Sequence, residues 1–270
     1  SLTFFSKNLL PFRNPKNSVK NPNRSLRTAL VGRTGRVLAF DRDPDRLDTL
    51  RRAAERAGAS AIVDARVADF LKVDPLDGRF ASVRAVLLDP SCSGSGTASA
   101  DVDASLAAAA AALAGKGGKG AGGGGGGEGK EEEKRRRRVA KLASFQLAAL
   151  KHALRFPNAE RVAYSTCSVH AEENERVVAA VLAWLGGEGG EDEGEKKGSS
   201  LPNAAPPPPS PPPRPEGWRL ARALPAWSTR GIPEGDESPL SLSPEDAAKV
   251  IRAHPAIDGT DGFFVAVFER

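Results

Sequence analysis

The sequence has very few of the residues from which disulfide frameworks and metal sites are built. Its 270 residues include two cysteines, three histidines and no methionine. Two cysteines far apart cannot form a disulfide framework, so we expect a reducing compartment. The three histidines show no metal-ligand spacing, and we predict no bound metal. Because methionine is absent even from position 1, we expect the chain to be an amino-terminally truncated fragment.

Long apolar runs are missing as well. No run approaches the roughly 18 to 20 residues that a membrane-spanning helix needs, so we expect no membrane partner. The formal net charge of +5 fits a polyanionic partner, although many proteins of this charge bind no nucleic acid.

The 28 glycines and 21 prolines are unevenly spread, and many lie in two low-complexity segments. Residues 107–138 pass from poly-alanine through poly-glycine to four arginines, and residues 186–216 pass from an acidic linker into polyproline. Such segments have too little apolar surface to offset their ordering entropy. We predict solvated inserts in surface loops of one domain, residues 26–270, preceded by a disordered basic segment, residues 1–25. The arginines 135–138 could be a solvated charge run or could contact phosphate.

The rest of the sequence alternates between strand and helix patterns. Strands are predicted at residues 36–40, 61–67, 82–89, 161–166 and 262–270, and helices at residues 44–57, 139–156 and 170–185. Strands separated by helices of this length indicate βαβ units. The predicted fold class is therefore α/β, with a mainly parallel sheet covered by helices on both faces.

Five side chains with possible chemistry follow the ends of the predicted strands: Asp41, Asp69, Asp89, Cys92 and Cys167. In an open α/β sheet, ligands bind beyond the carboxyl ends of the strands. We therefore expect these residues, which are spread over more than a hundred positions, to meet at one edge.

Each of these residues also has a purely structural interpretation. An acid after a strand is often a turn former or a helix cap, and a buried cysteine is usually inert. Asp41 is well placed for ribose hydroxyls, because it ends the second strand of a nucleotide-binding sheet. Cys167 lies at a strand-to-helix junction, where the helix dipole is predicted to lower its pKa toward the thiolate form.

Two sequence blocks, "LLDPSCSGSGT" (residues 87–97) and "YSTCSVHAEENERVV" (residues 164–178), resemble the paired signature of the Sun-domain RNA cytosine-5 methyltransferases. The closing "GFFVAVFER" resembles the last strand of that family. The "DPSCSGSG" form is most similar to the subgroup that acts on large-subunit ribosomal RNA. The resemblance covers residues 26–270 apart from the inserts, and it implies a Rossmann-like class I methyltransferase sheet with an antiparallel last strand.

The resemblance also implies a role for each candidate residue. Cys167 would be the nucleophile that adds to carbon 6 of cytosine, Cys92 would help to release the product, and Asp89 would hold the ring near N3. The implied cofactor is S-adenosylmethionine, bound by Asp41, Arg46, Asp69 and Asp89. The implied substrate is rRNA with its target base unstacked. The implied protein is a monomer of the nucleolus.

The sequence departs from the family at its amino-terminal end. The proline- and glycine-rich loop ending in Gly-x-Lys-Thr, which holds the methionine end of the cofactor, has no counterpart here. We therefore expect the first strand and the cofactor loop to be missing. One alternative is a catalytically impaired RNA-binding or ribosome-assembly factor that keeps the fold. A DNA cytosine methyltransferase is disfavoured, because its nucleophile directly follows proline, whereas Ser91 stands between Pro90 and Cys92 here.

Overall fold

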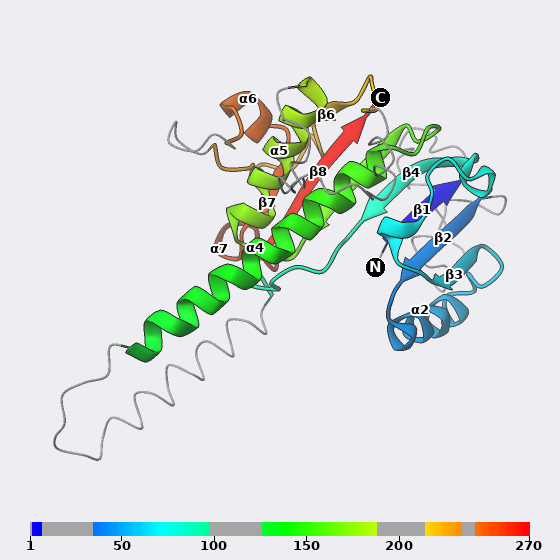
Figure 1. Cartoon of the computed structure of the whole chain (residues 1–270), viewed down its shortest axis with the longest axis horizontal. Helices are drawn as coiled ribbons and strands as arrows, with labels where there is room; N and C mark the ends of the chain where they lie inside the picture. The colour runs from blue at the N-terminus through cyan, green and yellow to red at the C-terminus, as the bar shows by residue number, and fades with distance from the viewer. Residues whose placement is uncertain (1, 7–34, 98–125, 188–213, 234–240) are drawn as a thin grey trace, which may run out of the picture.

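The computed structural model of the protein describes residues 2–6, 35–97, 126–187, 214–233 and 241–270 (Figure 1). Its strands form one eight-stranded sheet in the order β3-β2-β1-β4-β5-β8-β6, and β7 also pairs with β8. The strands are β1 (Leu2–Ser6), β2 (Arg36–Asp41), β3 (Val63–Val67), β4 (Val83–Leu88), β5 (Arg161–Thr166), β6 (Arg219–Ala221), β7 (Ile251–Ala253) and β8 (Phe263–Glu269). The α-helices are α2 (Pro44–Arg56), α4 (Gly126–Leu154), α5 (Glu175–Gly186), α6 (Pro244–Ala247) and α7 (Pro255–Asp258), and short 3-10 turns are η1 (Phe70–Lys72), η2 (Gly78–Phe80) and η3 (Ala171–Glu173).

The predicted α/β class is confirmed, and six of the eight strands run in the same direction. β2 pairs with β3 and β4 pairs with β5 in parallel. β8 runs antiparallel to β5, as expected for the last strand. β6 and β7 pair with successive parts of β8, and neither was predicted because a strand of three residues carries too short a pattern.

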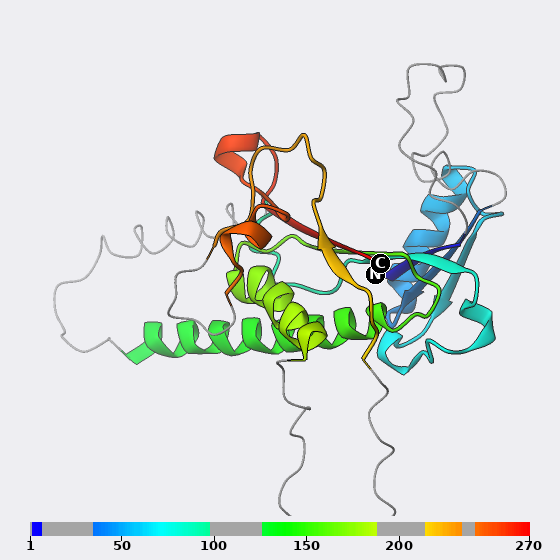
Figure 2. The same ribbon diagram turned by 90° about the horizontal axis from the view of Figure 1, so that it is seen from above.

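The connections place helices on both faces of the sheet. The chain moves outward in one direction from β2 to β3 and in the opposite direction from β4 to β5. Right-handed crossovers therefore put α2 and α4 on opposite faces. Figure 2 shows α4 and α5 together on one side of the sheet and α2 on the other. The main core lies on the α4 side, where Leu38 and Phe40 of β2 join Leu150 of α4.

The prediction of a disordered segment over residues 1–25 needs correction at its start, because residues 2–6 form a strand. Residues 2–6 form β1, which lies between β2 and β4 and runs antiparallel to both. Without a strand between β2 and β4, the backbone N–H and C=O groups on the facing sides of these two strands would have no partners. A strand running in either direction can pair with them. Leu2 therefore lies at the edge where β2 and β4 end, and Ser6 lies at the opposite edge. Residues 7–25 lie outside the described residues.

The predicted insert over residues 107–138 also needs correction, because α4 begins at Gly126 instead of at residue 139. Ion pairs one turn apart support the added turns, including Arg136–Glu132 at 3.2 Å and Arg137–Glu133 at 2.7 Å. The side chains of residues 129–138 are exposed, so the charged run is solvated although it is helical. Residues 107–125, and residues 188–213 of the second insert, lie outside the described residues. None of the described helices has the length and apolar character needed to cross a membrane.

Candidate active site

The two cysteines lie in contact at the carboxyl edge of the sheet. Cys92 follows β4 in the loop of residues 89–97, and Cys167 is the first residue after β5. The parallel register, with Leu88 beside Tyr164, brings these two strand ends together. The sulfur atoms are 3.2 Å apart, and both thiols are free and half-buried. The predicted meeting of the two cysteine loops is therefore observed.

The predicted lowering of the Cys167 pKa is wrong. The pKa of this thiol is raised from its ordinary value of 9.0 to about 12, because burial removes it from water and because Cys92 and Asp89 lie beside it. The helix dipole does not reverse this effect, since α5 begins only at Glu175, after the η3 turn. The protein without substrate therefore holds Cys167 as a neutral thiol at neutral pH.

Asp89 directly follows β4 and faces the end of β5. Its carboxylate accepts a hydrogen bond from the Ser165 hydroxyl at 3.3 Å. Its negative charge is one of the causes of the raised pKa of Cys167, so the two groups are electrostatically coupled. A carboxylate beside the two thiols can accept a hydrogen bond from a polar substrate atom.

Two glycines allow the Cys92 loop to pass close to the start of β8. The Gly96 N–H donates to the Cys167 carbonyl at 2.9 Å, and the Gly262 N–H donates to the Gly96 carbonyl at 2.7 Å. A Cβ atom added to Gly96 would lie 2.5 Å from the Gly262 carbonyl oxygen. Only glycine permits this backbone approach without a shift, so the serine- and glycine-rich loop is shaped to lie against Cys167.

The predicted cofactor residues lie at the ends of the neighbouring strands β2 and β3. Asp41 ends β2, forms an ion pair with Arg46 at 3.4 Å and accepts a hydrogen bond from the Asp43 N–H at 3.0 Å. Asp69 follows β3 and caps η1 through the Leu71 N–H at 3.2 Å. β1 separates these strands from β4, so the five predicted residues share one edge but form two groups.

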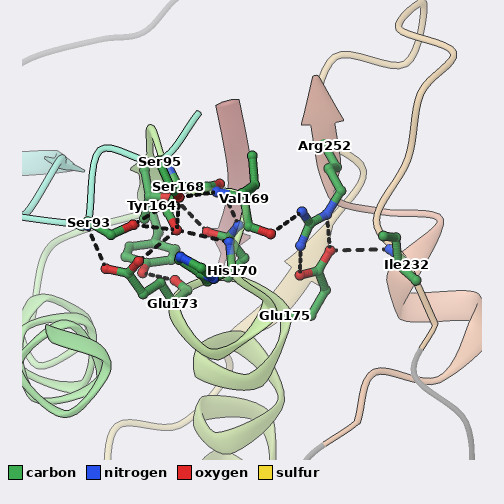
Figure 3. A network of polar contacts seen from close by, with 12 residues as sticks. Ser93, Ser95, Tyr164, Ser168, Val169, His170, Glu173, Glu175, Ile232 and Arg252 are labelled. Carbon is green, nitrogen blue, oxygen red and sulfur yellow. Dashed lines mark hydrogen bonds and ion pairs between the residues drawn. The ribbon is translucent and has the colours of Figure 1, made fainter. Parts of the chain in front are cut away.

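A buried polar network that the sequence pattern did not predict joins the loops after β4 and β5 (Figure 3). Glu173, Asn174 and Glu175 are fully buried. Glu175 forms an ion pair with Arg252, whose Nε donates to Oε1 at 2.8 Å. Arg252 also donates to the Val169 carbonyl at 2.8 Å. Three consecutive polar residues just after the TCS motif were the available signal, but only tertiary contacts show that they are buried.

No group of three or more histidine, cysteine or acidic side chains in the described part of the chain could hold a metal ion. His152 is buried in the core, where its ring packs edge-on against Phe70 with centroids 4.7 Å apart. Burial and the nearby charge of Arg155 lower the His152 pKa, so the ring is neutral at pH 7.

The mainly parallel sheet with helices on both faces is a Rossmann-like α/β fold. The chain superposes on a crystal structure of a methyltransferase homologue from Pyrococcus horikoshii with a TM-score of 0.51 and 20% identity, covering 86% of this chain and 52% of that one. This similarity shows the fold alone.

Sequence comparison identifies curated relatives. No family model matches the chain. It is 34% identical over 247 residues to the 25S rRNA (cytosine-C(5))-methyltransferase rcm1 of Schizosaccharomyces pombe, covering 90% of this chain and 41% of that protein. It is 35% identical over 242 residues to the 28S rRNA (cytosine-C(5))-methyltransferase of Mus musculus, covering 90% of this chain and 38% of that protein. The names of both relatives agree with the resemblance to the Sun-domain RNA cytosine-5 methyltransferases, and the chain spans about two fifths of the length of these curated relatives.

Proposed function

We propose that this protein methylates carbon 5 of a cytosine in large-subunit rRNA, with S-adenosylmethionine as the methyl donor. The observation that carries the proposal is the contact of the Cys92 and Cys167 sulfur atoms, 3.2 Å apart, at the carboxyl edge of the sheet. The names of the yeast and mouse relatives support the rRNA substrate. A nucleolar location and a monomeric state stay predictions.

The two thiols and Asp89 suit the chemistry of this reaction. Carbon 5 of cytosine is a weak nucleophile. When the Cys167 thiol gives up its proton to solvent and its sulfur bonds to carbon 6, the ring electrons shift toward carbon 5. S-adenosylmethionine supplies the electrophilic methyl group that carbon 5 then accepts. Loss of the carbon 5 proton to solvent and cleavage of the sulfur–carbon 6 bond, whose electron pair returns to the Cys167 sulfur, restore the double bond and release the enzyme. Cys92 lies beside the sulfur that must leave, and in this proposal Asp89 would hold the base near N3.

The residues described here fit only one end of the cofactor. Asp41 and Asp69 supply carboxylates at the ends of β2 and β3, where ribose hydroxyls and an adenine ring can be bound. The methionine end is expected to bind beyond the strand between β2 and β4. That strand is β1. Because it runs antiparallel to β2 and β4, its first residue, Leu2, lies at this edge, and the loop that follows β1 leaves from the opposite edge.

The proposal is tested by two substitutions that are expected to fail in different ways. The protein, and a version with the cofactor loop of the mouse relative grafted ahead of β2, are incubated with S-adenosylmethionine and rRNA. Cys167→Ala removes the group that adds to carbon 6, so neither methyl transfer nor a covalent adduct is expected. Cys92→Ala leaves addition intact but slows release, so a protein–RNA adduct is expected to survive denaturing electrophoresis.

Other outcomes would overturn specific parts of the proposal. An adduct with Cys167→Ala and none with Cys92→Ala would make Cys92 the nucleophile, as in the DNA enzymes. The absence of methylation and of adducts in the grafted protein, despite cofactor binding by calorimetry, would favour the non-catalytic RNA-binding or assembly factor. The direction of β1 is the observation that favours this second candidate.

A further inference from the structure

Glu173 connects the two cysteine loops through one buried carboxylate. It lies in η3, is fully buried, and accepts a hydrogen bond from the Ser93 N–H at 3.0 Å. Its other oxygen accepts from the Ser168 hydroxyl at 2.6 Å. Ser93 directly follows Cys92, and Ser168 directly follows Cys167. The same carboxylate therefore holds the residue next to each cysteine (Figure 3).

Gln146 of α4 extends this connection to the other side of Cys92. Its Nε2 donates to Glu173 at 2.9 Å and to the Ser91 carbonyl, also at 2.9 Å. The residues before and after Cys92 are thus both held by the Glu173–Gln146 pair. Tyr164, in the core strand β5, donates to Gln146 Oε1 at 3.3 Å and to the Glu173 carbonyl. The pair is itself fixed by the core of the domain.

A buried carboxylate needs a specific reason. Removing it from water costs several kcal/mol unless strong hydrogen bonds replace the lost hydration. Three groups donate hydrogen bonds to the Glu173 carboxylate: a backbone N–H, a side-chain amide and a hydroxyl. An apolar side chain at this position would avoid the cost but could not bond to both loops. The role of Glu173 is therefore to hold the two cysteine loops in place rather than to stabilise the fold.

The hydroxyl network fixes the direction of these hydrogen bonds. Ser168 Oγ accepts from the Ser93 hydroxyl and from the His170 N–H, each at 3.0 Å, and donates to Glu173. A glutamine at position 173 has one acceptor oxygen and one NH₂ group. If its oxygen faces Ser93 and Gln146, its NH₂ becomes a third donor to Ser168 Oγ. If it is flipped, its NH₂ faces two donors. Glu173→Gln thus keeps the shape but disrupts the network.

We propose that Glu173 is a positioning residue that holds the Cys92 and Cys167 sulfur atoms in contact. It acts through Ser93 and Ser168 and does not itself touch the substrate. The importance of this contact for catalysis rests on the proposed function, but the contact itself can be tested without RNA or cofactor.

The test measures how fast the two thiols form a disulfide in the folded protein. Diamide takes two electrons and two protons from a thiol pair, and the chain has only two cysteines, so any intramolecular disulfide joins Cys92 to Cys167. Glu173→Gln is expected to slow this reaction by about tenfold or more, because small displacements of reacting groups have effects of this size. Free-thiol counting over time gives the rate in dilute protein.

Two controls separate positioning from general stability. Glu172→Gln changes the neighbouring residue, whose exposed side chain pairs with Arg176 at 3.5 Å, and is expected to leave the rate unchanged. Val83→Ala creates a cavity at the start of β4, where Val83 is fully buried at the opposite edge. This variant is expected to lower the melting temperature without changing the rate of disulfide formation.

A second variant covers the case in which Glu173→Gln does not fold. Ser168→Ala removes only the hydroxyl that joins Glu173 to the Cys167 side, and it is expected to slow disulfide formation as well. A wild-type rate in either folded variant would overturn the proposal. If the variants form the disulfide more slowly but the wild-type protein does not methylate RNA, Glu173 is still supported as a positioning residue and only the proposed function fails. The two failures are therefore distinguishable.

Discussion

The two halves of the sheet edge are built in different ways. On the β4–β5 side, the polar contacts join residues far apart in the sequence: Ser93 to Glu173 across 80 positions, and Arg252 to Glu175 across 77. On the β2–β3 side, Asp41 and Asp69 bond to backbone groups two residues away. The first half is fixed by tertiary contacts, whereas the second is held by local turns. A site that holds reacting groups needs the first kind of support.

The largest expected effect comes from breaking the buried ion pair of the β4–β5 half. Glu175 is completely buried, and the Arg252 side chain is only 12% exposed. Arg252→Ala leaves an uncompensated carboxylate in the core, so we expect the free energy of unfolding to fall by about 3 to 5 kcal/mol. Urea unfolding monitored by circular dichroism measures this loss.

A double variant shows whether the buried charge is the cause. Glu175→Gln in the Arg252→Ala background removes the charge but keeps an acceptor for the Ile232 N–H. Part of the lost stability should therefore return. If the double variant is as unstable as the single one, lost packing of Arg252, not the unpaired charge, explains the effect.

The next effect concerns the reactivity of Cys167. Because its pKa is raised from 9.0 to about 12, the thiolate fraction at pH 8 should be roughly a thousandfold below that of an ordinary thiol. Alkylation of Cys167 by iodoacetamide, followed by peptide mass spectrometry, should be slow at pH 8 and should accelerate as the pH rises toward 12. A rate that levels off below pH 9 would instead support the lowered pKa predicted from the sequence.

The same shift has a consequence for stability. A group whose pKa is higher in the folded state binds its proton more tightly there. Its contribution to stability is therefore complete below about pH 9 and is lost as the pH rises toward 12. Over this range, the wild-type protein should lose more stability than Cys167→Ala, and a parallel decline of the two proteins would contradict the shift.

Elements that depend on local interactions could be predicted from the sequence, whereas those that depend on contacts between distant residues could not. Strands β2, β3, β4, β5 and β8 and helix α2 were predicted because their apolar patterns and end signals are local. Residues 126–138 were missed as helix because glycine and a charged run suggested an insert, whereas ion pairs one turn apart support the helix. β1 was missed because its position depends on the gap between β2 and β4.

The candidate site shows the same division. The location of Cys92 and Cys167 at one edge was predicted because strand ends converge in a parallel sheet. The pKa of Cys167 was mispredicted because burial and the Asp89 charge act across space. Glu173 and Glu175 look like ordinary first-turn acids in the sequence, and their burial depends on partners in the Cys92 loop and in β7.

The smallest expected effect comes from the matching substitution in the β2–β3 half. The Arg46 side chain is 52% exposed and lies 3.4 Å from Asp41, so solvent screens their attraction. Arg46→Ala should therefore lower the free energy of unfolding by at most about 1 kcal/mol. Arg51→Ala, which breaks an exposed pair with Asp48 on the same helix and a hydrogen bond to the Ala65 carbonyl, is the comparison variant. A loss from Arg46→Ala as large as that from Arg252→Ala would show that both halves are interlocked to the same degree. A small loss of stability combined with a clear loss of S-adenosylmethionine affinity would show that Arg46 serves the ligand rather than the fold, as expected of a half held mainly by local turns.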